Sequence, residues 1–126
     1  MITKGGEIGM TFVFEKLEVY QKALDFVEEI YVFCKSFRDK DLSPSIYQIK
    51  RASLSVPLNI AEGNGRKHKK EKLDFFHISR GSLLECVSII QLIGRMLPEQ
   101  SQKCMSLYHQ AEQIGKMLSG LINWTK

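Results

Sequence analysis

The sequence lacks the features that mark secreted, membrane-spanning or zinc-binding proteins. Its three cysteines are an odd number at wide spacing without a C-x-x-C pair, which argues against disulfides and against a zinc site. The first nine residues, MITKGGEIG, contain no apolar signal segment, and no apolar run is long enough to cross a bilayer. We therefore expect a cytoplasmic protein with no metal and no membrane partner, and with Cys34, Cys86 and Cys104 buried as small hydrophobic side chains.

Motifs for nucleotide binding and catalysis are missing as well. Gly63 and Gly65 lack the third glycine of a dinucleotide fingerprint because His68 stands at that position, and no Walker-type phosphate loop occurs. Ser79 or Cys86 as a nucleophile would need the distant His109 as its base, nothing local supports that pairing, and no carboxylates converge as a pair. The sequence predicts a protein that is not an enzyme and holds no cofactor.

What the sequence does contain is four long segments whose apolar residues recur at steps of three and four, as in amphipathic helices. No segment alternates apolar and polar residues as a half-buried strand does. The four segments run from about Glu15 to Phe37, from Ser43 or Ser45 to Gly63, from Lys67–Lys69 to Met96, and from Glu99 to Trp124. Segments of similar length joined by short loops pack antiparallel, so we predict an all-α, antiparallel up-down four-helix bundle. It is expected to span residues 14–126 after a flexible N-terminal extension, 1–13.

Three of the segments carry a second apolar row, which exceeds the single stripe that a bundle helix needs. The second segment has its main row at Ile46, Ile49, Ser53, Val56 and Ile60, and another face at Tyr47, Leu54 and Leu58. Large exposed apolar surfaces usually mark interfaces, so we expect a homo-oligomer. An error in the helix phases is the alternative explanation.

The end of the second segment carries turn chemistry. We expect Pro57 to remove one helical hydrogen bond and bend the helix, and Gly63 to end it. Gly63 and Gly65 then form a tight turn that needs positive φ. Asn59 and Glu62 lie three residues apart on one face. They are expected either to bond free backbone groups around the turn or to pair with a cation across an interface, with an acid–base role as the alternative.

Positive charge is concentrated just after this turn. The net charge is +4, and the seven residues from Arg66 to Lys72 hold five cations against Glu71, which accounts for all of it. Cations at a helix N-terminus oppose the macrodipole, so we expect phosphate contact with RNA or DNA to favour them. The alternative is a solvated helix start that aids solubility. No aromatic residue lies within the cluster, so base-specific recognition is not expected. The expected contacts are Lys50, Arg51, Arg66, Lys67, Lys69, Lys70 and Lys72.

Two stretches carry a family resemblance, FEKLEVYQKALDF (Phe14 to Phe26) and IKRASLSVPLNIAEGNGRKHKKEKLDFFHISRGSLLE (Ile49 to Glu85). They resemble the bacterial four-helix-bundle family encoded in intervening sequences of 23S rRNA genes, over about Phe14 to Leu121. The family motif falls on Ser55, Val56, Pro57, Asn59, Ile60, Ala61, Glu62, Gly63, Gly65 and Arg66. The resemblance implies antiparallel bundles assembled into a ring-like homopentamer, and it brings no catalytic residues.

A structurally similar branch, the accessory variability determinant of diversity-generating retroelements, resembles a basic pentamer that binds nucleic acid and a reverse transcriptase. The first functional hypothesis is therefore a non-enzymatic, oligomeric protein that associates with RNA or DNA. The second is a protein-interaction scaffold that docks an acidic partner such as a reverse transcriptase or nuclease.

Overall fold

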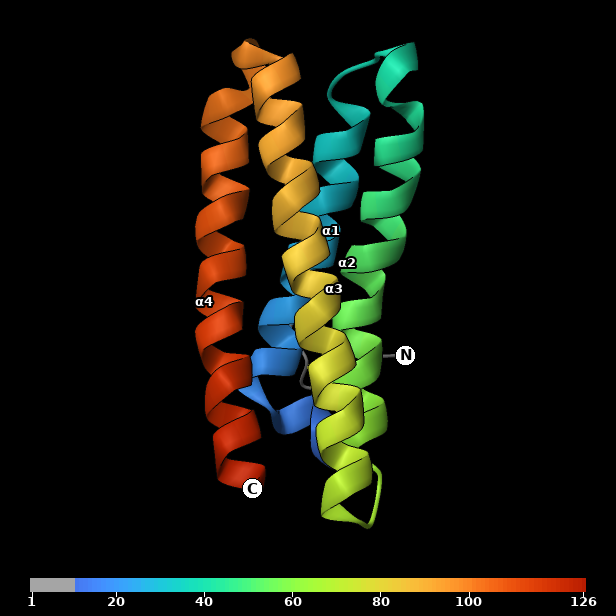
Figure 1. Cartoon of the computed structure of the whole chain (residues 1–126), viewed down its shortest axis with the longest axis vertical. Coiled ribbons are helices and arrows are strands. Elements are labelled where there is room, and N and C mark those ends of the chain that lie inside the picture. The colour runs from blue at the N-terminus through green and yellow to red at the C-terminus, as the bar shows by residue number, and fades with distance from the viewer. Residues whose placement is uncertain (1–10) are drawn as a thin grey trace.

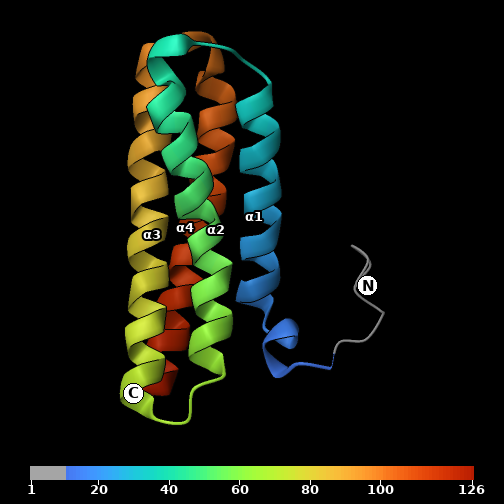
Figure 2. The same cartoon turned by 90° about the vertical axis from the view of Figure 1, so that its right-hand side faces the viewer.

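The helical periodicity of the sequence becomes four long helices in the computed structural model, which describes residues 11–126. The helices are α1 (Glu18–Lys35), α2 (Ser43–Asn64), α3 (Lys69–Met96) and α4 (Ser101–Thr125), with short 3₁₀ turns η1 (Val13–Lys16), η2 (Lys40–Leu42) and η3 (Pro98–Gln100). They run alternately up and down, side by side, and the described residues contain no strand (Figures 1 and 2). The predicted all-α antiparallel four-helix bundle is confirmed. Most of the predicted extension, residues 1–10, lies outside the described residues.

Each helix packs against two neighbours, in the order α1, α2, α3, α4 and back to α1. The core between them is built from large side chains that are almost fully buried, Phe26, Phe33, Phe76, Ile30, Ile49, Ile60, Ile90, Ile93, Leu107, Ile114 and Leu118. Each such side chain stabilises the fold by about 1.5–3 kcal/mol relative to exposure. The bundle is therefore held chiefly by hydrophobic burial.

The three cysteines lie in this core, as predicted, and all are free thiols. Burial raises the pKa of Cys86 to about 12 from a usual value near 9.0. The thiol stays protonated at neutral pH, so it packs as a small hydrophobic group and does not act as a nucleophile.

The two apolar rows predicted for the second helix are present on opposite sides of α2. Ile49, Val56 and Ile60 are buried, while the second row remains in solvent. We call this second row the α2 outer stripe; its exposed fractions are 64% for Tyr47, 41% for Leu54 and 55% for Leu58. The helix phase was therefore predicted correctly, and the apolar exposure follows from the amino-acid sequence.

Small polar residues line the contact between α2 and α3. The Ser79 hydroxyl donates a 2.8 Å hydrogen bond to the carbonyl of Val56, and the Ser82 hydroxyl donates one of 2.8 Å to the hydroxyl of Ser55. α2 continues without interruption through Pro57, which has no N–H to donate. Among the described residues every buried side-chain nitrogen or oxygen has a partner, so these serines are satisfied within the contact.

The predicted role of the two glycines is wrong. α2 continues one residue past Gly63, and Gly65 has φ −81° and ψ −6°, in the right-handed region open to any residue. Gly63 is needed for a different reason, because a Cβ there would lie 2.7 Å from Cε1 of Phe76 and 3.0 Å from Cβ of Phe75. Only a residue without a side chain lets α2 and α3 approach this closely.

We expect Gly63→Ala to lower the free energy of unfolding by about 1–3 kcal/mol, since the added methyl group overpacks the contact with the buried Phe76 ring. Urea denaturation monitored by circular dichroism measures the change.

Gly81→Ala is the matched control, because Gly81 also lies inside a helix but a Cβ there meets nothing within 4 Å. This substitution should stabilise the protein by about 0.4–1 kcal/mol through the lower entropy of the unfolded chain. If both alanine substitutions stabilise the protein equally, α2 and α3 do not approach each other closely at Gly63.

Candidate nucleic-acid interface

Five of the seven predicted basic residues, Arg66, Lys67, Lys69, Lys70 and Lys72, lie at the end of the bundle where α2 turns into α3, the lower end in Figure 1. We call residues 66–72 the basic tip. The turn is short because the N–H of Gly65 bonds the carbonyls of Ala61 and Glu62, and the N–H of Arg66 bonds that of Gly63. These bonds continue the winding of α2 up to the loop, so few residues between the helices are free to move.

Arg66 is held by its neighbours. Its guanidinium makes a 2.8 Å ion pair with Glu62, and its Cζ lies 4.7 Å from the centre of the Phe75 ring. Both charged side chains are largely exposed, so the pair adds only about 0.5 kcal/mol to stability, but it fixes where the guanidinium lies. Within one subunit, Glu62 thus pairs with the cation that begins the turn.

The Asn59 side chain bonds within α2 and not within the turn. Its side-chain amide donates to the main-chain oxygen of Ser55 at 2.8 Å and to the Ser55 hydroxyl at 2.9 Å, one helical turn earlier. The expectation that Asn59 and Glu62 bond backbone groups around the turn is therefore wrong. Glu62 does reach the turn, but its carboxylate pairs with the Arg66 side chain and not with a backbone group.

Two lysines of the basic tip bond main-chain oxygens. Lys72 Nζ donates to the carbonyl of Asn64 at 2.9 Å and so satisfies an oxygen at the end of α2. Lys69 Nζ donates at 3.1 Å to the main-chain oxygen of Lys126, which follows α4. The basic tip is thereby joined to the ends of both neighbouring helices.

Lys67 and Lys70 are different, because they are exposed and make no hydrogen bond or ion pair within residues 11–126. They flank the start of α3, where the N-cap residue His68 has no side-chain capping bond. The first N–H groups of α3 therefore face solvent without a capping side chain, at the positive end of the helix dipole. Two unpaired ammonium groups and an uncapped helix start together attract anions.

Lys50 and Arg51 do not extend the basic tip. Arg51 is thirteen residues before Asn64 on the same helix, a rise of about 20 Å. Lys50 Nζ lies 5.4 Å from the centre of the Tyr31 ring, and the Arg51 guanidinium lies 5.7 Å from that of Tyr47. The structure thus places these two cations beside aromatic rings in the upper half of the bundle, apart from the other five.

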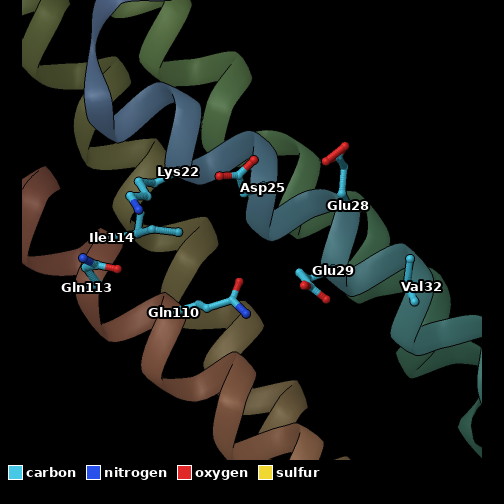
Figure 3. Close-up of a pocket in the computed structure, with 8 residues that line it drawn as sticks. All are labelled: Lys22, Asp25, Glu28, Glu29, Val32, Gln110, Gln113 and Ile114. Atoms are coloured by element: carbon cyan, nitrogen blue, oxygen red, sulfur yellow. The ribbon is translucent and has the colours of Figure 1, made fainter. Parts of the chain in front are cut away.

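A groove of about 680 Å³ lies between α1 and α4 (Figure 3). Carboxylates on the α1 side give it the opposite charge to the basic tip, and one of them, Glu29, pairs with Lys103 of α4 at 3.1 Å. Its lining residues are Lys22, Asp25, Glu28, Glu29, Val32, Gln110, Gln113 and Ile114. Within the described chain no three histidine, cysteine or carboxylate side chains gather to hold a metal ion. The groove offers no chemistry for phosphate binding.

One residue near the basic tip was not predicted there. Trp124 is 86% exposed and lies in the last turn of α4, two residues before Lys126, whose main-chain oxygen accepts the Lys69 hydrogen bond. The signal was available in the topology, because the fourth helix of an up-down bundle ends where the third begins.

The fold and the basic tip define a four-helix-bundle protein, and none of its described helices is long and apolar enough to cross a membrane. The chain belongs to the 23S rRNA-intervening sequence protein family, whose model matches residues 15–120. The family resemblance of the sequence is thereby confirmed, while the relation to diversity-generating retroelements stays a prediction.

A solved structure supports the same fold. The chain is similar to the crystal structure of a protein of unknown function from the S23 ribosomal protein family of Bacteroides thetaiotaomicron. The two are 21% identical, with a TM-score of 0.76 over 82% of this chain and 97% of that chain. No curated protein matches this chain. The likeness shows the shared four-helix architecture, and the function has to be argued from the site.

Proposed function

We propose that this protein is a non-enzymatic, oligomeric protein that binds RNA or DNA by contacting phosphates with the basic tip. The observation that supports this most is the pair Lys67 and Lys70, which are unpaired within the described residues and flank the uncapped start of α3. The family is named for intervening sequences of 23S rRNA, which agrees with a nucleic-acid partner.

The contacts within the basic tip limit how strongly one subunit binds. Arg66 and Lys72 already bond protein groups, so Lys67 and Lys70 are the cations most available to phosphate. Each contact to a single strand contributes about −0.7 to the slope of log K against log salt, so two contacts contribute about −1.4. Binding by a single subunit is weak by this measure, and an assembly that repeats the basic tip strengthens it through effective concentration.

The α2 outer stripe provides the surface for such an assembly. Tyr47, Leu54 and Leu58 expose apolar side chains on one face of α2, and Phe14 of η1 and Leu58 line a shallow pocket at the end of this face. Covering this area with a second copy removes apolar surface from water at about 25 cal/mol per Å². Self-association through α2 is therefore part of the proposal.

We expect the wild-type chain of 14.5 kDa to give a multiple of that mass in light scattering at micromolar concentration. Leu54→Glu with Leu58→Glu should lower the mass towards one subunit, because the two charges cannot be buried unpaired in the interface. The control Leu84→Glu, at a residue of similar exposure on α3, should leave the mass unchanged. A wild-type protein that is a single subunit would contradict self-association.

Lys67→Glu with Lys70→Glu should weaken binding of a single-stranded oligonucleotide at least about tenfold at low salt and flatten its salt dependence. The matched control is Lys35→Glu with Lys40→Glu, which makes the same change in net charge at the opposite end of the bundle (Figure 1). Fluorescence anisotropy with a labelled oligonucleotide over a series of salt concentrations measures both effects.

Equal losses in the two double variants would show that net charge matters and that the basic tip does not. An unchanged affinity in the variant with Lys67→Glu and Lys70→Glu would contradict the proposed phosphate contact. If the wild-type protein does not bind nucleic acid but binds an acidic polypeptide, the scaffold alternative would be supported instead.

A further inference from the structure

Trp124 has the highest exposed fraction of the large hydrophobic residues that the structure describes, 86%, and it is the single tryptophan of the sequence. Neither a ring contact nor a hydrogen bond engages its side chain within residues 11–126. Burying an aromatic side chain lowers the free energy of the folded state, as it does for the phenylalanines of the core. An indole that stays in water contributes none of this stabilisation. The position is therefore poorly explained by the stability of a single subunit.

Trp124 lies at the same end of the molecule as the basic tip. Figures 1 and 2 both show the end of α4 close to the beginning of α3, and the hydrogen bond from Lys69 to the main-chain oxygen of Lys126 joins them. The rise between Trp124 and Lys126 is only about 3 Å. Two positions earlier, Ile122 is buried in the core, and a step of two residues turns a helix by about 200°. The indole therefore points away from the core, on the outer side of α4.

An exposed aromatic ring at the same end of the bundle as a group of lysines suits one kind of ligand. Single-stranded nucleic acid presents phosphates to cations and unpaired bases to aromatic faces, and stacking contributes about 1–3 kcal/mol per base. Bases within a duplex are already stacked and cannot reach the ring. An indole stacks on any base, so such a contact selects single strands without selecting a sequence.

We propose that Trp124 stacks on an unpaired base of a single strand whose phosphates contact Lys67, Lys69 and Lys70. This inference rests on the proposed function and adds the ligand class, single-stranded RNA or DNA. It keeps the expectation that recognition is not base-specific, while the fold brings the aromatic residue that the cluster lacks from the far end of the sequence. In the complex Lys69 exchanges its bond to the Lys126 oxygen for a phosphate, and the strand passes around the end of α4 to the indole.

The intrinsic fluorescence of the single tryptophan reports the contact directly. We expect oligo-dT and oligo-U of about 15 nucleotides to quench it as they bind. A duplex of equal length and inorganic polyphosphate should bind the lysines without quenching. Comparing the two single strands shows whether RNA or DNA is the stronger ligand.

Trp124→Ala should lower the affinity for both single strands by about 5- to 150-fold and leave the affinity for the duplex unchanged. Trp124→Phe retains an aromatic face and should recover most of the affinity. Because the side chain is outside the core, urea denaturation should show no loss of stability in either variant.

The possible failures are distinguishable. Formation of a salt-sensitive complex with unaltered tryptophan fluorescence, and with wild-type affinity in Trp124→Ala, would overturn stacking and leave the phosphate contacts in place. Absence of any complex at low salt, for single strands and duplex alike, would overturn both the stacking and the proposed function.

Discussion

The close approach of α2 to α3 at Gly63 and Phe76 is the constraint on which the end of the molecule with the basic tip depends. A side chain at Gly63 would overlap the Phe76 ring, so the two helices can meet here only at a glycine. Because they meet, the connection between them is short, and Lys72 of α3 reaches the carbonyl of Asn64 at the end of α2. The same proximity sets the Arg66 guanidinium over the Phe75 ring. The packing of one aromatic ring against one glycine thus determines where the cations of the basic tip lie.

The cations of the basic tip divide into two groups with different consequences. Arg66 and Lys72 stabilise the turn through their bonds to Glu62 and Asn64, whereas Lys67 and Lys70 contribute nothing evident to it. Unpaired positive charge at the positive end of a helix dipole opposes folding slightly, so its presence is better explained by a ligand than by stability. The carboxylates along the α1–α4 groove have the opposite effect on a polyanion, which they repel from the side of the bundle. The electrostatic pattern therefore favours approach of nucleic acid at the end of the molecule.

The fold could be predicted from the sequence because helical periodicity extends over nearly the whole chain. The start of α3 at Lys69 and its end at Met96 agree with the pattern of apolar residues and with Pro98. The chemistry of the site was harder to predict, because it depends on contacts between residues far apart in the sequence. The role of Gly63 depends on Phe76 of the next helix, and the bond from Lys69 to the Lys126 oxygen depends on the antiparallel course of α4, which brings Trp124 to the same end of the bundle. The spacing of apolar residues along one helix indicates which side chains face the core. It does not indicate which residues of other helices they contact.

The central claim is that nucleic acid contacts one end of the bundle and no other surface. Photo-cross-linking of the intact protein to a single strand carrying 4-thiouracil or 5-bromouracil, followed by mass spectrometry of the peptides, tests it most directly. The account predicts cross-links confined to residues 64–72 and 122–126. Cross-links concentrated in the α1–α4 groove or along the middle of α2, with none at the end of the bundle, would contradict it.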